Sequence, residues 1–219
     1  MQLAAPQRID RATVLRYLGA GGWDPDTGTA ALLEKAEAAL RSTATPRGVW
    51  REVPFAALDL EHGGTDLARH LRGCDTMVLL AATLGAAADT LIRRMEVTDM
   101  ALAAVTDATA SVMLEAVCDE LEAFVRAKIT ATGRYMTGRY APGYGDCGLE
   151  MQDDLCLALD TVRGMGLAVT PEHLMTPRKS TTAVLGVASH PVTGARAGCA
   201  HCLLREKCAY RKRGKTCED

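Results

Sequence analysis

Aromatic side chains are scarce in this sequence: phenylalanine, tyrosine and tryptophan together make up 4% of its 219 residues. Apolar residues nevertheless account for 48% of the chain, and alanine is common among them. The chain can therefore bury a substantial core, and its small side chains favour closely packed helices. The length fits one large domain, or one domain with a small appendage.

An excess of positive charge is also absent, since the formal net charge is −2 at pH 7. The chain as a whole therefore has no general attraction for nucleic acid or for an anionic membrane surface. No segment reads as a signal peptide, and the longest apolar run, 77–88, is too short to span a bilayer. We accordingly expect a cytoplasmic protein with no nucleic-acid partner and no membrane association.

The hydrophobic pattern predicts a mixture of helices and strands. The most regular helical pattern runs over 98–129, with Val105, Val117, Leu121 and Phe124 on its apolar face. A threonine followed by proline and glutamate at 170–172 indicates a further helix start. The other expected helices cover 10–18, 29–42, 65–71, 86–95 and 149–163, the last with Val162 on its inner side, and the expected strands cover 48–60, 75–85 and 180–189. The strand at 48–60 contains Pro54, which favours an edge position.

Four of the eight cysteines lie close together near the C-terminus, in the spacing Cys199-x2-Cys202-x5-Cys208-x8-Cys217. Thiolates at this spacing can converge on one zinc ion or iron–sulfur cluster, and His201 could substitute for one of them. The spacing matches neither a regular zinc ribbon nor a standard ferredoxin, and we favour iron–sulfur over zinc. A reduced tail, or a pair of disulfides, is the alternative interpretation.

The chain changes character after Gly194. The stretch from 199 to 219 carries a net charge of +3, which leaves −5 on the remainder, and it has few large aliphatic residues. Metal binding would supply the folding free energy that so small a core cannot. We therefore divide the chain into a main domain, 1–194, and a small cysteine-rich module, 195–219.

The other cysteines are scattered through the main domain. Cys118 and Cys156 fall in helical patterns and are expected to fill the core. Cys147 falls in a glycine-rich stretch, where its thiol could be exposed. None of these positions predicts a metal site.

The stretch GRYAPGYGDCG, 138–148, is too irregular for a strand and too rich in glycine for a helix. Pro142 fixes one backbone angle, whereas Gly143 and Gly145 allow conformations closed to other residues. Such a loop can expose its peptide groups to a ligand, Arg139 can pair with a carboxylate, and Tyr144 can stack on a flat polar group. A tight turn that carries a surface arginine is the alternative interpretation.

The motif Arg-x-x-x-Gly-Tyr within this stretch resembles the S-adenosylmethionine-binding motif of the activation (reactivation) domain of cobalamin-dependent methionine synthase. The segment GLAVTPEHLMTPRKSTTAVLGVASHP, 166–191, and the upstream helix EAVCDELEAFV also resemble that family. The resemblance covers roughly 75–191. It is strongest to the free-standing members, in which this domain is a separate chain with a cysteine-rich C-terminus.

The resemblance implies an α+β fold, with a twisted, mainly antiparallel sheet flanked by helices and a small cysteine-rich C-terminal module. It also implies that Arg139 meets the methionine carboxylate of S-adenosylmethionine. The matching loop residues that would hold the nucleoside are Ala141, Pro142, Gly143 and Tyr144. Glu115 matches a helix glutamate near the ligand in that family, although a solvated helix carboxylate is an equal interpretation.

The function implied by the resemblance is that of an accessory subunit. It would bind S-adenosylmethionine and support reductive methylation of cobalamin on a partner methionine synthase or other corrinoid protein. The cysteine module could relay the required electron from a flavodoxin or ferredoxin. Two alternatives are an iron–sulfur or zinc protein that transfers electrons to a corrinoid methyltransferase system, and a scaffold of such a system.

Overall fold

The computed structural model describes residues 1–194 and 206–212. The helices are α1 Arg11–Tyr17, α2 Thr27–Thr43, α3 Gly64–His70, α4 Ala86–Thr98, α5 Met100–Thr130, α6 Met151–Leu159, α7 Thr161–Met165 and α8 Ala209–Lys212. The strands are β1 Arg47–Val53, β2 Thr76–Thr83, β3 Tyr135–Met136, β4 Ala168–Val169, β5 Met175–Thr176 and β6 Ser180–Ala188. The fold class is α+β, as the sequence and its resemblance predict.

The main sheet has four antiparallel strands in the order β1-β2-β6-β3. Its two central strands, β2 and β6, pair along their whole length, with Leu79 opposite Val184. β1 lies at one edge, as expected, but the strand expected over 48–60 ends at Val53, so Pro54 follows the strand rather than lying within it. β4 and β5 form a separate two-stranded ribbon.

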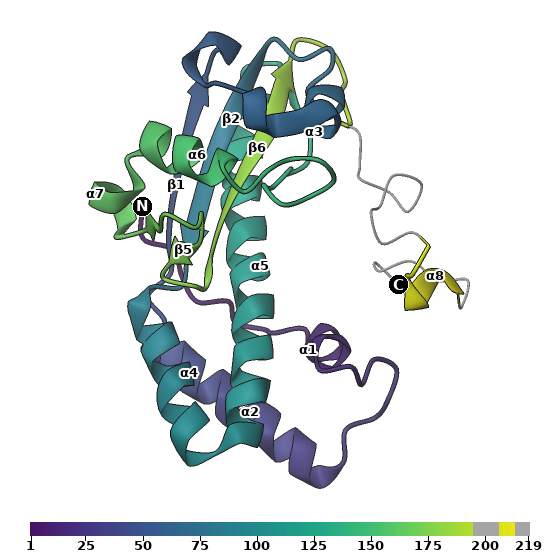
Figure 1. Cartoon of the computed structure of the whole chain (residues 1–219), viewed down its shortest axis with the longest axis vertical. Helices are drawn as coiled ribbons and strands as arrows, with labels where there is room; N and C mark the ends of the chain where they lie inside the picture. The colour runs from purple at the N-terminus through teal and green to yellow at the C-terminus, as the bar shows by residue number, and fades with distance from the viewer. Residues whose placement is uncertain (195–205, 213–219) are drawn as a thin grey trace.

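Both faces of the sheet are buried because the side chains of β2 alternate between two apolar clusters. Val78, Leu80 and Ala82 point into the cluster that contains most of the buried residues of α5. Met77, Leu79 and Ala81 belong to the opposite cluster, which they share with residues of α3 and α6. Figure 1 shows α5 behind the sheet and α3 and α6 in front of it.

α5 is the longest helix and joins the two ends of the molecule. Its first half packs with α1, α2 and α4, and its second half lies against the sheet (Figure 1). Asp99 begins it by accepting a hydrogen bond from the Leu102 N–H at 3.0 Å. The helix is long and apolar enough to cross a membrane, but 61% of its most apolar window is buried within the fold, as in a core helix.

Two side chains that were expected on the apolar faces of helices are exposed in the structure. Phe124 is 40% exposed, beneath the ammonium of Lys128, rather than on the buried stripe of α5. Val162 is 63% exposed because the helix expected over 149–163 is interrupted at Asp160, which has left-handed dihedrals of 49° and 48°. The interruption turns α7 away from the direction of α6, so that Val162 no longer follows the α6 stripe.

The helix start expected at 170–172 was wrong. Thr170 instead begins the turn between β4 and β5, where its N–H donates to the Leu174 carbonyl at 2.8 Å. Its hydroxyl accepts from the N–H groups of Glu172 and Leu174, both at 3.3 Å. A hydroxyl followed by proline satisfies the exposed donors of a turn as well as those of a helix, so the two structures share one local signal.

The central position of β2 leads to a stability prediction. Leu80→Ala should lower the free energy of unfolding by about 2–5 kcal/mol, because the side chain is fully buried between the sheet and α5. Leu157→Ala is the matched control: Leu157 is 82% exposed, and its removal should change the free energy by less than about 0.5 kcal/mol. Urea unfolding of both variants measures the difference, and equal midpoints would contradict the assigned packing.

Candidate functional site

The segment that carries Arg139 is fixed to the edge of β6 at two points. Before the arginine, the Thr137 N–H donates to the Gly186 carbonyl at 2.9 Å. After it, Tyr140 and Val184 exchange two backbone hydrogen bonds of 2.9 and 2.8 Å. Arg139 therefore leaves the sheet edge at a defined place, beside α5.

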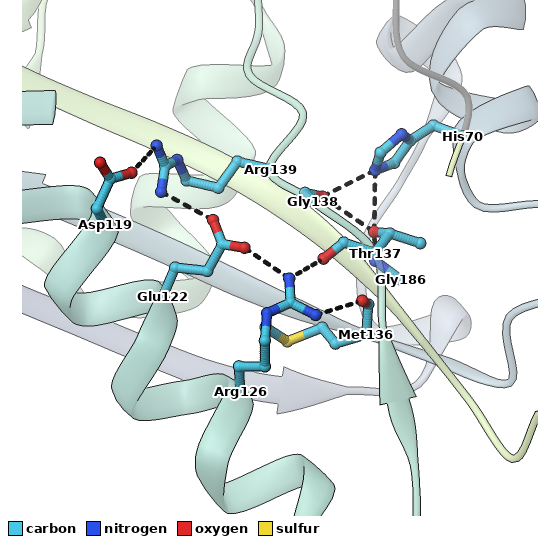
Figure 2. A network of polar contacts seen from close by, with 9 residues as sticks. All are labelled: His70, Asp119, Glu122, Arg126, Met136, Thr137, Gly138, Arg139 and Gly186. Atoms are coloured by element: carbon cyan, nitrogen blue, oxygen red, sulfur yellow. Dashed lines mark hydrogen bonds and ion pairs between the residues drawn. The ribbon is translucent and has the colours of Figure 1, made fainter. Parts of the chain in front are cut away.

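The Arg139 guanidinium lies against three carboxylates of α5. Its Nη1 is 2.8 Å from Glu122, and its Nη2 is 2.7 Å from Asp119 and 3.4 Å from Glu115. Figure 2 shows the first two of these contacts. Burial lowers the pKa of Arg139, but the hydrogen bond to Asp119 and the neighbouring negative charges outweigh it, so the pKa lies above its ordinary value.

A second arginine, Arg126, ties one of these carboxylates, that of Glu122, to the backbone. The Nη2 of Arg126 donates to Glu122 at 2.6 Å and to the Thr137 carbonyl at 2.7 Å, while its Nη1 donates to the Met136 carbonyl at 2.5 Å. Glu122 thus lies between two guanidinium groups (Figure 2). This network joins α5 to the segment immediately before Arg139.

His70, at the end of α3, approaches that segment from the other side of the sheet edge (Figure 2). Its Nε2 lies 3.0 Å from both the Gly138 carbonyl and the Thr137 hydroxyl, and the same hydroxyl accepts from the Gly186 N–H at 2.8 Å. The imidazole is buried, and its ring contacts the Tyr140 ring at a tilt of 46°, with the centroids 5.2 Å apart. The backbone on both sides of Arg139 is therefore fixed by side chains as well as by the sheet.

The glycine-rich stretch after Arg139 forms a tight turn. Gly143 and Gly145 have positive φ angles of 87° and 56°. The Gly143 N–H donates to the Cys147 carbonyl at 3.0 Å, and the Tyr144 N–H donates to the Ala141 carbonyl at 3.3 Å. These two peptide donors, which the sequence led us to expect at a ligand, are used within the turn itself.

The turn packs directly on α3. A Cβ at Gly145 would lie 2.2 Å from a carboxylate oxygen of Asp66, so this glycine is required by close packing. The Asp146 carboxylate accepts hydrogen bonds from the N–H groups of Thr65 and Asp66 at 2.8 and 2.9 Å, and from the Thr65 hydroxyl at 2.6 Å. These donors hold the pKa of Asp146 at about 2.

The outer surface of the turn is formed by Gly143 and Tyr144, and the tyrosine side chain is 61% exposed. Ala141 and Pro142 are half-buried beneath them. The Tyr140 hydroxyl donates to the Tyr144 carbonyl at 3.0 Å, and burial raises the pKa of Tyr140 to about 12. An aromatic ring thus stands at the surface on a firmly supported backbone.

The five loop residues selected from the sequence, Arg139, Ala141, Pro142, Gly143 and Tyr144, lie together in one segment, and Glu115 reaches the same arginine from α5. Four further residues that contact this segment were not predicted as site residues from the sequence: His70, Asp119, Glu122 and Arg126. A signal for three of them exists, because Glu115, Asp119, Glu122 and Arg126 follow one another at intervals of three or four residues and so share a helix face. Nothing in the sequence indicates His70.

A surface hollow of about 520 Å³ lies farther along α5. Its lining includes Tyr17 and Ser111, and Ser111 precedes Glu115 by one helical turn. The Lys179 ammonium contacts two residues that line this hollow, Ser111 and Asp107, both at 2.9 Å. A second hollow, of about 440 Å³, lies on α4, and neither hollow is lined by the glycine-rich turn.

Three of the four cysteines of the main domain are buried, whereas Cys74 is half-buried, and partial burial raises the pKa of its thiol. Cys118 and Cys156 are buried, as expected, and burial raises the pKa of both thiols, that of Cys118 to about 12. Cys147 is also buried, with its pKa raised to about 11, so the exposed position suggested by the sequence is not found. It points inward because the turn folds back onto α3 and α6.

The metal site expected at Cys199, Cys202, Cys208 and Cys217 lies largely outside the described residues. Of the four, only Cys208, immediately before α8, is described. Within 1–194 and 206–212, no group of three or more histidine, cysteine or acidic residues has a metal-binding arrangement.

The contacts of Asp146 predict a pH-dependent contribution to stability. The pKa in the fold, about 2, is below the ordinary value of 3.8, so the stabilisation is present above about pH 4 and is lost as the pH falls towards 2. Asp146→Ala should therefore lower the urea midpoint at pH 7, and the difference from the wild type should shrink between pH 4 and 3. Asp24→Ala, in an exposed loop, is the control. An equal difference in urea midpoint at pH 7 and pH 3 would contradict a stabilising role for the hydrogen bonds that the Asp146 carboxylate accepts from Thr65 and Asp66.

Comparison with known proteins gives a structural match without a sequence match. No family model matches the chain, and no curated protein matches it. Among solved structures, a MetH reactivation domain bound to AdoHcy is similar, with a TM-score of 0.66 and 18% sequence identity. The match covers 99% of this chain and 85% of the other. At this identity the likeness concerns the fold, and this chain therefore shares its fold with the MetH reactivation domain.

Proposed function

We propose that this chain binds S-adenosylmethionine and acts as an activation subunit for a cobalamin-dependent methionine synthase or a related corrinoid protein. The observation that carries the proposal is the coincidence of two independent features. One is the fold, matched over nearly the whole chain to a domain crystallised with AdoHcy. The other is the motif Arg139-x-x-x-Gly143-Tyr144, which lies on a supported turn with its tyrosine exposed.

The chemistry follows from the reactants. One electron reduces cob(II)alamin to cob(I)alamin, whose cobalt then attacks the methyl carbon of the sulfonium. The carbon–sulfur bond breaks, its electron pair stays on sulfur, and the products are methylcobalamin and S-adenosylhomocysteine. No proton is transferred, so the protein needs no general base, and its contribution is proximity and alignment.

The residues of the site take distinct parts in this proposal. Arg139 binds the ligand carboxylate through its guanidinium. Tyr144 and the backbone of 141–143 support the nucleoside, and the exposed ring of Tyr144 can pack on a flat base. Glu115, on the exposed side of α5, lies within reach of groups bound to Arg139. Because the turn lies at the surface, a ligand there stays accessible to a cofactor held by another protein.

The site predicts binding of S-adenosylmethionine that depends on Arg139. Arg139→Ala should weaken binding by about 10- to 150-fold, the effect of losing hydrogen bonds between charged groups. Arg163→Ala is the matched control, since Arg163 is 88% exposed and 3.8 Å from its partner Asp160. Isothermal calorimetry measures both. No binding by the wild type, or equal binding by all three proteins, would contradict the proposal.

Activation itself requires a partner. We propose a cytoplasmic, cobalamin-bearing protein, with a flavodoxin or ferredoxin as the electron donor. A methionine synthase that lacks its own activation domain, inactivated in the cob(II)alamin state, supplies the assay. Recovery of activity should require this chain, S-adenosylmethionine and the reductant together.

The cysteine-rich module, 195–219, supports a second element of the proposal. Four thiolates in the spacing Cys199-x2-Cys202-x5-Cys208-x8-Cys217 suit an iron–sulfur cluster or zinc, and a cluster could relay the electron. This feature also favours the alternative function, an electron-transfer or scaffold protein of a corrinoid system. That alternative would keep the metal but lack binding of S-adenosylmethionine.

The tail predicts a metal content that anaerobic purification can measure. Visible absorption with iron and sulfide bound would identify a cluster, whereas zinc without colour would identify a structural site. Cys202→Ser should lower the metal content, and Cys156→Ser, at a buried position of the main domain, should not. A metal-free wild type with four titratable tail thiols would exclude the site.

A further inference from the structure

The three carboxylates around Arg139 differ in how firmly they are held. Glu122 is 18% exposed and contacts Nη1, whereas Asp119 and Glu115 are 70% and 56% exposed and both contact Nη2. The two edges of one guanidinium therefore have different surroundings. Nη1 faces the supported network, and Nη2 faces carboxylates at the surface.

Glu122 has a fixed position. Its second oxygen lies 2.6 Å from Arg126, which in turn donates to the backbone carbonyls of Met136 and Thr137 (Figure 2). Movement of Glu122 would break this set of contacts together, because they share Arg126. The carboxylate thus sets the orientation of the Arg139 guanidinium.

Asp119 is held far less firmly. In the described part of the chain its carboxylate bonds only to Arg139, at 2.7 Å. The Arg139 side chain is 22% exposed, but that of Asp119 is 70% exposed, so solvent stabilises the Asp119 carboxylate when it separates from the guanidinium. Asp119 can therefore leave Nη2 and turn into solvent at small cost.

We propose that the two carboxylates have opposite roles in ligand binding. Glu122 is a positioning residue that presents Arg139, and Asp119 is an internal competitor that occupies the Nη2 edge until a ligand carboxylate replaces it. This inference rests on the proposed function, because the incoming carboxylate is that of S-adenosylmethionine. It adds a selection step, since a ligand without a carboxylate cannot take the place of Asp119.

The proposal predicts opposite signs for two substitutions that each remove one negative charge. Asp119→Asn should tighten binding of S-adenosylmethionine by about two- to fivefold, the scale of an exposed ion pair. Glu122→Gln should weaken it by about three- to tenfold, because the guanidinium loses its orientation. A general electrostatic effect would instead weaken both variants, since S-adenosylmethionine carries a net positive charge.

Calorimetry with two ligands and combined variants tests the assignment. Decarboxylated S-adenosylmethionine lacks the group that Arg139 binds, so its affinity should not rise in Asp119→Asn. Glu122→Gln should weaken S-adenosylmethionine binding less in the Arg139→Ala background than in the wild type, which shows that Glu122 acts through Arg139. Circular dichroism and urea unfolding check that each variant is folded.

The outcomes separate this inference from the proposed function. Weaker binding by folded Asp119→Asn, with Arg139 still required, would overturn the inference alone. Because Asp119 is at the surface, this variant decides the question even if Glu122→Gln does not fold. Absence of binding by both the wild type and Asp119→Asn would overturn the proposed function and the inference with it.

Discussion

The packing of α5 on one face of the sheet is the constraint on which the candidate site depends. Val117, Leu121 and Val125 are fully buried against the sheet side of the core. The carboxylates that meet Arg139 come from the adjoining, more exposed face of the same helix. Burial of the apolar face therefore also places the acidic face beside the edge of β6. The same packing that forms the core therefore also places the carboxylates of the site.

The site is supported from two directions. The Arg126 network joins α5 to the segment before Arg139, and the Asp146 carboxylate joins the glycine-rich turn to α3. α3 and α5 lie on opposite sides of the sheet, and the segment links the two apolar clusters, since Met136 belongs to that of α5 and Tyr140 and Cys147 belong to that of α3. A surface loop held in this way is preorganised, which suits the proposed role of aligning a ligand for a cofactor held by a partner.

Local signals predicted most of the fold, because the central strands and α5 are long, apolar and strongly periodic. β2 is buried on both faces and reads as a continuous apolar run, whereas β6 was predicted from its β-branched residues. Pro54, just after β1, indicated the edge strand. The failures had local causes as well. A threonine followed by proline occurs both in turns and at helix starts, so the sequence around Thr170 did not distinguish the two. Asp160 has a left-handed backbone conformation, but no glycine marks this position in the sequence. The partners of Arg139 escaped prediction because they depend on the register between a helix and a sheet edge that is distant in sequence.

One face of α5 carries a stripe of four charged residues, Glu115, Asp119, Glu122 and Arg126. This stripe restricts where residues can be inserted into the chain. Each residue added to a helix turns everything beyond it by about 100° relative to what precedes it. An inserted codon between Glu115 and Arg126 would leave a helix of good composition but separate the stripe into two faces. Insertions that keep the stripe intact are therefore expected only outside the twelve residues 115–126, in the loops or near the helix ends. Relatives that keep the arginine motif should therefore show an ungapped alignment here, even where the rest of the sequence has diverged.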